Sequence, residues 1–160
     1  MTTIAYRDGI MAADTMMSRG SEKAFGAVKI FATKKYLVGI SGAFVAMTPV
    51  KDLITEHEET FPEPSQMWRE WDEIPQYGNG YCALLVGRDG RIWNAIDGPP
   101  VLVPTEFDAI GSGGTYAMGA MGAGLSAADA VRVARRFDAN TGGNVIRLNL
   151  TQIGTNCEAR

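Results

Sequence analysis

The sequence contains few of the residues on which metal sites and disulfide frameworks depend. Its 160 residues include one histidine and two cysteines. A zinc site built on several histidines is therefore excluded, and two cysteines far apart in the sequence are a poor substitute. Cys82 and Cys157 form no C-x-x-C pattern, so we expect reduced core or surface thiols. We expect no cofactor.

The single histidine also limits nucleophilic catalysis. A Ser-His-Asp or Cys-His site would have to use His57. This residue lies in a charged stretch, residues 54–59, which is typical of the solvated end of a helix. We expect an exposed surface histidine there, so hydrolytic chemistry in this chain would have to take its base from another group.

Basic residues do not outnumber acidic ones, and long apolar runs are missing. Fifteen lysines and arginines stand against 18 aspartates and glutamates, a formal charge of −3. Nucleic-acid binding favours a basic face, so no nucleic-acid partner is expected. No run approaches the ~20 apolar residues of a membrane span, and the first six residues do not form a secretory signal. We expect a cytoplasmic protein without a membrane partner.

Composition and the order of elements favour one globular α+β domain over residues 1–160. Hydrophobic residues make up 46% and charged residues 21%, which excludes a disordered chain. Strands are predicted at residues 2–7, 10–14, 25–31 (within the region 22–33), 36–41, 81–87, 91–96, 101–103, 107–110 and 144–152. Helices are predicted after residue 42, briefly within 61–78, at 116–123 and at 126–137. Blocks of strands and helices in this order favour α+β layers over βαβ units.

Thr2 is the residue best equipped for catalysis. Once Met1 is removed, the chain begins with a threonine that carries both a hydroxyl and a free α-amine. A hydroxyl is a weak nucleophile and needs an adjacent base. An α-amine has a pKa of about 7.7–8.0, and nearby positive charge lowers that pKa further. One residue can thus supply nucleophile and base, and no histidine is needed.

Six segments, spread in order over nearly the whole chain, carry a family resemblance. They are residues 2–14 with the Asp8-Gly9 turn, 18–20, Lys29-Ile30, 39–42, the I-G-S-G-G run at 110–114 and the D-A-N-T-G-G-N-V run at 138–145. Together they resemble proteasome β-type subunits and the bacterial HslV protease. The resemblance implies a four-layer αββα sandwich of the N-terminal-nucleophile hydrolase type and a threonine-type endopeptidase.

The resemblance also implies a role for each residue of the site. Thr2 would be the nucleophile, Lys29 would keep the site positive, and Asp14 would orient Lys29 as an ion pair. Asp138 and Ser112 would position the amine and a water, supported by Thr141. The Gly42 N–H would point at the developing oxyanion. Implied substrate-binding positions are Ser18, Gly20, Met17, Ile40 and Phe44. The last three would make an apolar pocket for cleavage after hydrophobic residues, unless they belong to the core.

The implied partners are a peptide or unfolded protein substrate and further copies of the chain in a ring. We expect two stacked rings of six or seven, and the resemblance allows an ATPase unfoldase cap. The small-residue helix at 116–123 and the pair Trp68 and Trp71 suit an interface. The opening hairpin is shorter than in the family, and the region 61–78 replaces a long helix.

Other interpretations of the same residues stay open. The chain could be a non-catalytic ring or scaffold subunit of the same fold, or a small-molecule amidohydrolase. Asp14 and Lys29 could form an ordinary surface pair, Ser112 could be a helix N-cap, and Gly42 could be only a turn. The glycines at 111–114 could suggest phosphate binding, but they lack the Lys and Ser/Thr of a P-loop.

Overall fold

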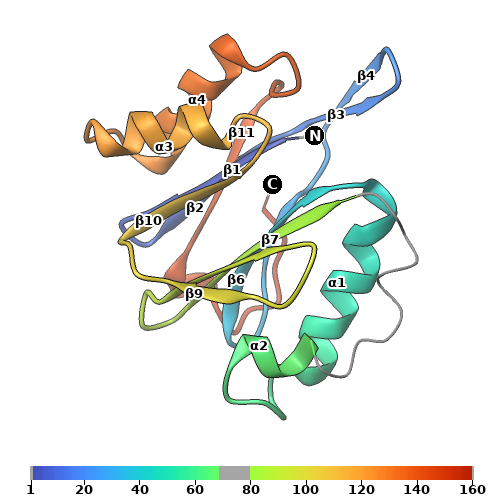
Figure 1. The fold of residues 1–160 in the computed structure, drawn as a ribbon, viewed down its shortest axis with the longest axis vertical. Helices are drawn as coiled ribbons and strands as arrows, with labels where there is room; N and C mark the ends of the chain where they lie inside the picture. Colours follow the sequence, from blue (N-terminus) through green and yellow to red (C-terminus); the bar gives the residue numbers. More distant parts are fainter. Residues whose placement is uncertain (1, 69–79, 160) are drawn as a thin grey trace.

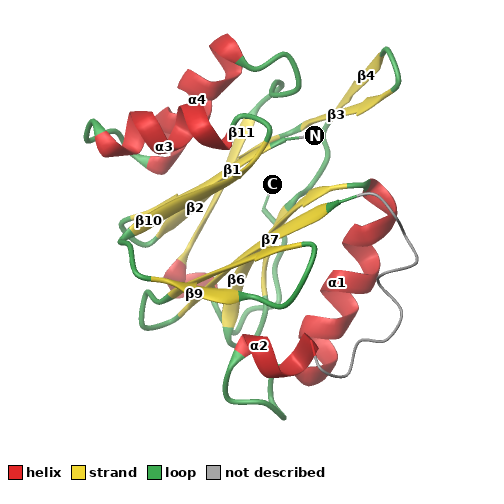
Figure 2. Ribbon diagram, in the orientation of Figure 1, coloured by secondary structure: helices red, strands yellow, loops and turns green. Residues whose placement is uncertain are grey.

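The computed structural model describes residues 2–68 and 80–159. Two antiparallel sheets lie face to face, and helices cover the outer face of each (Figures 1 and 2). The first sheet has the order β10-β1-β2-β11, with strands β1 (Thr3–Arg7), β2 (Ile10–Asp14), β10 (Phe107–Gly111) and β11 (Val145–Asn149). Helices α3 (Gly114–Gly122) and α4 (Ala127–Phe137) pack against it.

The second sheet has the order β5-β6-β7-β8-β9. Its strands are β5 (Ile30–Ala32), β6 (Tyr36–Gly42), β7 (Tyr81–Gly87), β8 (Ile92–Ile96) and β9 (Val101–Val103). Helix α1 (Phe44–His57) and the short α2 (Pro64–Met67) cover its outer face, as Figure 2 shows. The αββα sandwich that the resemblance implies is therefore confirmed.

Alternation along β1 explains how one strand serves two layers of core. Ile4 and Tyr6 point into the core between the two sheets. Ala5 points the other way, into the layer below α3 and α4, where Ala12 and Met121 also lie. Successive side chains of a strand face opposite sides of its sheet, and small residues on the helical side let the helices approach closely.

The hairpin β1–β2 brings both ends of the first segment to one edge of the sandwich. Asp8 and Gly9 have φ of 50° and 78°, which suits the primed turns that join strands through two residues. Register pairs Ile4 with Ala13, so Thr2 and Asp14 lie at the same edge. The predicted Asp8-Gly9 hairpin is confirmed, and it places two of the implied site residues together.

The strand predicted at residues 25–31, within the region 22–33, is wrong. The structure instead has two strands, β4 (Glu22–Phe25) and β5, and a strand β3 (Met16–Arg19) that was not predicted. Strands β3 and β4 form a separate hairpin that projects beyond the sandwich (Figure 1). The break has a local cause, because Gly26 has φ of +97° and the N–H groups of Gly26 and Ala27 both donate to the Thr15 carbonyl.

The structure adds three smaller points. The helix predicted after residue 42 begins at Phe44 and continues through Pro49, which lies inside α1. The last strand ends at Asn149, whose side chain accepts from the Thr151 N–H and begins a 3₁₀ turn. Trp68 is buried and donates to the Tyr81 hydroxyl at 2.7 Å, so it supports the subunit's own core rather than an interface. Trp71 lies outside the described residues.

The end of α1 is more buried than its charge suggests. His57 is half-buried and its ring lies 6.0 Å from that of Phe61. Glu58 is fully buried, accepting from the Thr33 hydroxyl at 2.5 Å and from the Lys34 N–H at 3.1 Å. Glu58 therefore fixes the turn between β5 and β6, while Glu56 and Glu59 of the same charged stretch are exposed. Both cysteines are free thiols, as expected. Among residues 2–68 and 80–159, no helix is long and apolar enough to span a membrane.

Candidate active site

Three implied site residues converge where the two sheets meet. Thr2 precedes β1, Asp14 ends β2, and Lys29 comes directly before β5 of the other sheet. Their exposed fractions are 2%, 0% and 5%. The Lys29 Nζ donates to the Thr2 hydroxyl and, at 2.9 Å, to Asp14 Oδ1. The Thr2 hydroxyl in turn donates to the same carboxylate oxygen. Asp14 and Lys29 are thus a buried pair around the threonine hydroxyl, and the surface-pair interpretation is wrong.

Backbone donors hold Asp14 in this position. The Thr3 N–H donates to its Oδ1 at 2.9 Å, while the N–H groups of Gly142 and Met16 donate to Oδ2 at 2.9 and 3.2 Å. Hydrogen bonds to a charged acceptor are about twice as strong as neutral ones. The carboxylate is therefore fixed from three sides and presents one oxygen to Thr2 and Lys29.

The environment of Lys29 acts on its charge in two directions. Burial lowers the pKa of its ammonium group, and the charge and hydrogen bond of Asp14 partly offset that shift. The ammonium also donates to the Met16 carbonyl. A cation held in this way lies directly beside Thr2, so it favours the neutral form of any amine and the anionic form of any oxygen there.

A second cluster lies on the other side of Thr2. Asp138 Oδ2 accepts from the hydroxyls of Ser112 and Thr141 at 2.6 and 2.5 Å. The Ser112 Oγ also lies 3.4 Å from the Thr2 carbonyl oxygen, and Thr141 shares a 2.6 Å hydrogen bond with Thr3. Burial raises the pKa of Asp138, but the hydrogen bonds from Ser112 and Thr141 outweigh it and lower the pKa overall. The cap of α3 is Gly113, so Ser112 is not the N-cap.

The glycines of the I-G-S-G-G run let this loop lie against β1. A Cβ on Gly111 would be 2.0 Å from the Thr2 carbonyl oxygen, and one on Gly113 would be 2.0 Å from Thr3 Oγ1. Gly111 also has φ of +93°. The run therefore serves close contact with the amino-terminal strand, which brings Ser112 beside Thr2, rather than a phosphate cradle.

Backbone alternation gives the direction of the Gly42 N–H. In an antiparallel sheet, consecutive residues of a strand hydrogen-bond to opposite neighbours. The Ile40 N–H donates to the Lys29 carbonyl at 3.0 Å, whereas the Ala43 N–H donates to the Gly80 carbonyl at 3.3 Å on the other side. The Gly42 N–H therefore points to the Lys29 side. Gly42 has φ of +118°, and a Cβ there would be 2.2 Å from the Gly80 carbonyl oxygen.

A pocket of about 150 Å³ opens beside Gly42. Thr2, Lys29 and Gly42 line it together with the predicted Met17, Ile40, Phe44 and Ser18. Phe44 is 66% exposed, so it is not a core residue, whereas Ile40 is buried and belongs to the core under α1 as well as to the pocket wall. Gly20 lies elsewhere, at the turn between β3 and β4 with φ of +61°, because the hairpin carries it away from the pocket.

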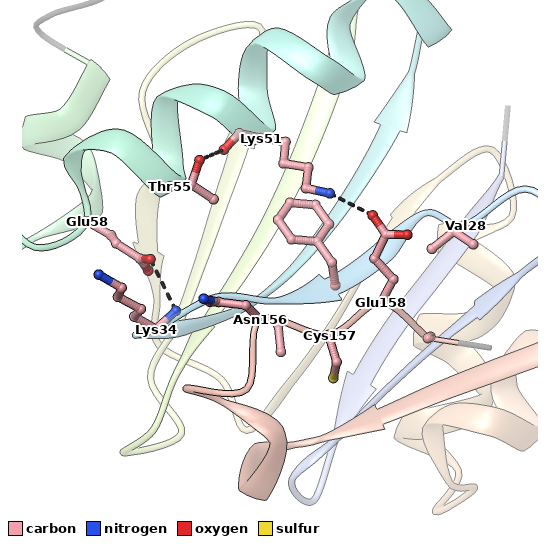
Figure 3. Close-up of a pocket in the computed structure, with 11 residues that line it drawn as sticks. Val28, Lys34, Lys51, Thr55, Glu58, Asn156, Cys157 and Glu158 are labelled. Atoms are coloured by element: carbon pink, nitrogen blue, oxygen red, sulfur yellow. Dashed lines mark hydrogen bonds and ion pairs between the residues drawn. The ribbon is translucent and has the colours of Figure 1, made fainter.

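A larger pocket of about 720 Å³ lies between α1, β5 and residues 156–159, and Figure 3 shows it. Its charged side chains are already paired. Lys51 forms a 2.6 Å ion pair with Glu158 and lies 5.0 Å from the centre of the Phe31 ring. In the described ranges 2–68 and 80–159, no three His, Cys, Asp or Glu side chains are grouped to hold a metal ion.

Several contributors to the site were not predicted from the sequence. Thr3, Met16 and Gly142 act through a hydroxyl or a backbone group. Met47, Ala27, Ser41 and Ala43 complete the pocket. The helical spacing after Phe44 could have indicated Met47, since residues three apart share a helix face.

Comparison with known proteins gives matches only among solved structures. No protein-family model and no curated protein matches the sequence. Eukaryotic HslV from Trypanosoma brucei matches with a TM-score of 0.70 and 19% identity, over 92% of this chain and 98% of that one. BPH from Thiobacillus denitrificans matches with a TM-score of 0.70 and 22% identity, over 93% of this chain and 97% of that one. The structure of the same protein in complex with epoxomicin matches with a TM-score of 0.66 and 21% identity, over 93% of this chain and 98% of that one. The chain therefore has the fold that the resemblance to HslV implied.

Proposed function

We propose that this chain is a threonine-type endopeptidase subunit in which Thr2, exposed by removal of Met1, is the nucleophile. One observation carries the proposal. The Thr2 hydroxyl lies between Lys29 and Asp14, and Thr2 lines the same pocket as Gly42. A scaffold subunit has no need of such an arrangement. We also propose that residues 1–160 form one peptidase domain of a cytoplasmic protein.

The chemistry follows from the two functional groups of Thr2. The α-amine, directly or through a water, takes the hydroxyl proton as Oγ1 attacks the scissile carbonyl carbon. The resulting oxyanion accepts from the Gly42 N–H. The amine then returns the proton to the leaving nitrogen as the C–N bond breaks, which leaves an ester on Thr2. Water, activated by the same amine, hydrolyses the ester and restores the hydroxyl.

The two clusters support this cycle in different ways. Lys29 donates to Oγ1 and, as a cation, lowers the pKa of the adjacent amine. Asp14 keeps Lys29 in place and charged. Ser112 and Asp138 would hold the amine and the water, with Thr141 fixing the Asp138 carboxylate.

The pocket indicates the substrate class. Its side walls, Met17, Ile40, Phe44 and Met47, are apolar. We therefore propose cleavage of peptides or unfolded proteins after hydrophobic residues. Because BPH has been solved with epoxomicin, we also propose that epoxomicin binds Thr2 of this chain.

Processing provides the test of the proposal. A methionine aminopeptidase removes Met1 when the next side chain is small, so the intact mass of protein from its original host should be that of a chain beginning at Thr2. Such protein should also cleave fluorogenic peptides with a hydrophobic residue before the scissile bond. Quantitative retention of Met1 would contradict the proposal, as would a strict preference for small non-peptide amides.

Assembly is a separate expectation. Ala117 and Met121 of α3 pack inward, whereas a Cβ on Gly119 or Gly122 would meet open space. Exposed Tyr116 stacks on exposed Phe137 of α4 at 5.6 Å. We propose a cyclic homo-oligomer, two stacked rings of six or seven with Thr2 facing an inner chamber, which an ATPase unfoldase could cap. Mass photometry should find this assembly at micromolar concentration, and a monomer throughout that range would overturn it.

A further inference from the structure

Asp97 follows β8 and forms hydrogen bonds with both backbone polar groups of Tyr81, the first residue of β7. Its backbone N–H donates to the Tyr81 carbonyl at 3.1 Å, and its Oδ1 accepts from the Tyr81 N–H at 2.8 Å. Asp97 has φ of 51°, a conformation that aspartate and asparagine tolerate better than most residues. The next residue adds a third link, because the Tyr81 hydroxyl donates to the Gly98 carbonyl at 2.9 Å.

Tyr81 and Gly80 are the direct support of Gly42. Tyr81 is the register partner of Gly42 across β6 and β7. The Gly80 carbonyl accepts from the Ala43 N–H, and a Cβ on Gly42 would lie 2.7 Å from the Tyr81 Cα. With contacts this close, a shift at the start of β7 must move Gly42 as well. Asp97 is thus connected to Gly42 through Tyr81 and Gly80.

We propose that Asp97 is a positioning residue for the oxyanion donor of this site. It fixes Tyr81 and Gly80, which in turn fix the peptide that presents the Gly42 N–H to the pocket. The inference rests on the proposed function, since it assigns a role in the same reaction. Asp97 does not line the pocket, so its effect is on the transition state rather than on the fit of the substrate side chain.

The variants separate the side-chain acceptor from general loss of structure. Asp97→Ala removes the acceptor, whereas Asp97→Asn keeps a carbonyl oxygen in its place and tolerates the same φ. Asp8→Ala is the matched control, because Asp8 has φ of 50° and lies in the remote β1–β2 turn. We expect Asp97→Ala to lower kcat roughly 10- to 100-fold with KM within about twofold. Asp97→Asn should recover most of the loss, and Asp8→Ala should match the parent.

A pair of inhibitors tests the oxyanion role directly. A peptide aldehyde adds the Thr2 hydroxyl across its carbonyl, which places an oxygen where the oxyanion forms, while the corresponding peptide alcohol binds without that addition. Asp97→Ala should weaken the aldehyde by the same factor as kcat and leave the alcohol unchanged. Unchanged kcat, equal weakening of both inhibitors, or failure of Asp97→Asn to recover activity would overturn the inference.

Hydrogen exchange keeps this inference distinguishable from the proposed function. Backbone amides of residues 42–47 should exchange faster in Asp97→Ala than in the parent and in Asp8→Ala, whether or not the protein cleaves peptides. A parent protein that neither cleaves peptides nor binds the aldehyde contradicts the proposed function alone. Unchanged exchange at residues 42–47 contradicts the positioning role.

Discussion

Replacing Thr2 by alanine should lower peptide cleavage by at least about 10⁴-fold, because removal of a nucleophile leaves only binding and oxyanion stabilisation. The same loss is expected for Thr2→Val, which keeps the shape of the buried side chain and removes only the oxygen that Lys29 and Asp14 contact. Thr2→Ser keeps a hydroxyl and an α-amine on one residue and should retain partial activity. The measurement is kcat/KM with a short fluorogenic peptide.

Each Thr2 variant has to be checked for removal of Met1 and for correct folding. Alanine, valine and serine are all small, so removal of Met1 should continue, and intact mass confirms it for each variant. Each variant keeps the Asp14–Lys29 pair, so thermal unfolding should change little. A Thr2→Val protein that is folded, processed and as active as the parent would mean that another residue attacks the substrate.

Loss of the Lys29 charge should reduce turnover at least about a hundredfold. Without this cation the pKa of the Thr2 amine rises, so the acid limb of the pH–rate profile should move to higher pH. Asp14→Asn should act on the alkaline limb of the same pH–rate profile. Asp14 raises the pKa of Lys29 against the effect of burial, so removing its charge lowers that pKa further. The alkaline limb should therefore move to lower pH.

Folding has to be checked alongside these profiles. Removing one member of a buried pair leaves the other unpaired, at a cost of about 3–5 kcal/mol. The double variant Lys29→Met/Asp14→Asn leaves no unpaired charge, so it should be more stable than either single variant while remaining inactive. Lys51→Ala, which removes a partly exposed lysine of α1, is the matched control. Unchanged rate and profile in a folded Lys29→Ala protein would contradict the electrostatic role.

The sequence predicts the layers of the fold well because local signals agree with the global arrangement. Asp8-Gly9 predicts a hairpin, and the structure has one there. The helix predicted at residues 126–137 likewise appears as α4, with Ser126 as its N-cap. The failures lie where tertiary contacts override a pattern. Apolar residues around Gly26 suggest one continuous strand, but a hydrogen bond from the Gly26 N–H to the Thr15 carbonyl divides it in two.

The candidate site was predictable in part. Side chains with distinctive chemistry, such as Thr2, Asp14 and Lys29, are named by the resemblance, and the structure brings them together. Residues that act through their backbone or through a second layer have no such signal. Asp97 is an example, because its role depends on a contact with Tyr81, 16 residues away in sequence. Gly20 shows the opposite error. Its segment, residues 18–20, resembles the family pattern, but the hairpin of β3 and β4 carries Gly20 away from the pocket.

The central claim is that the free amine and the hydroxyl of Thr2 act as one reactive centre. Epoxomicin tests it, because an α′,β′-epoxyketone has two electrophilic carbons, and a stable ring forms only when hydroxyl and amine of one residue add to both. The measurement is intact mass followed by peptide mapping of epoxomicin-treated protein. We expect a mass increase equal to the whole inhibitor, located on the peptide beginning at Thr2 and missing in Thr2→Val. Protein that cleaves peptides yet gains no such adduct, or gains it at another residue, would contradict the account.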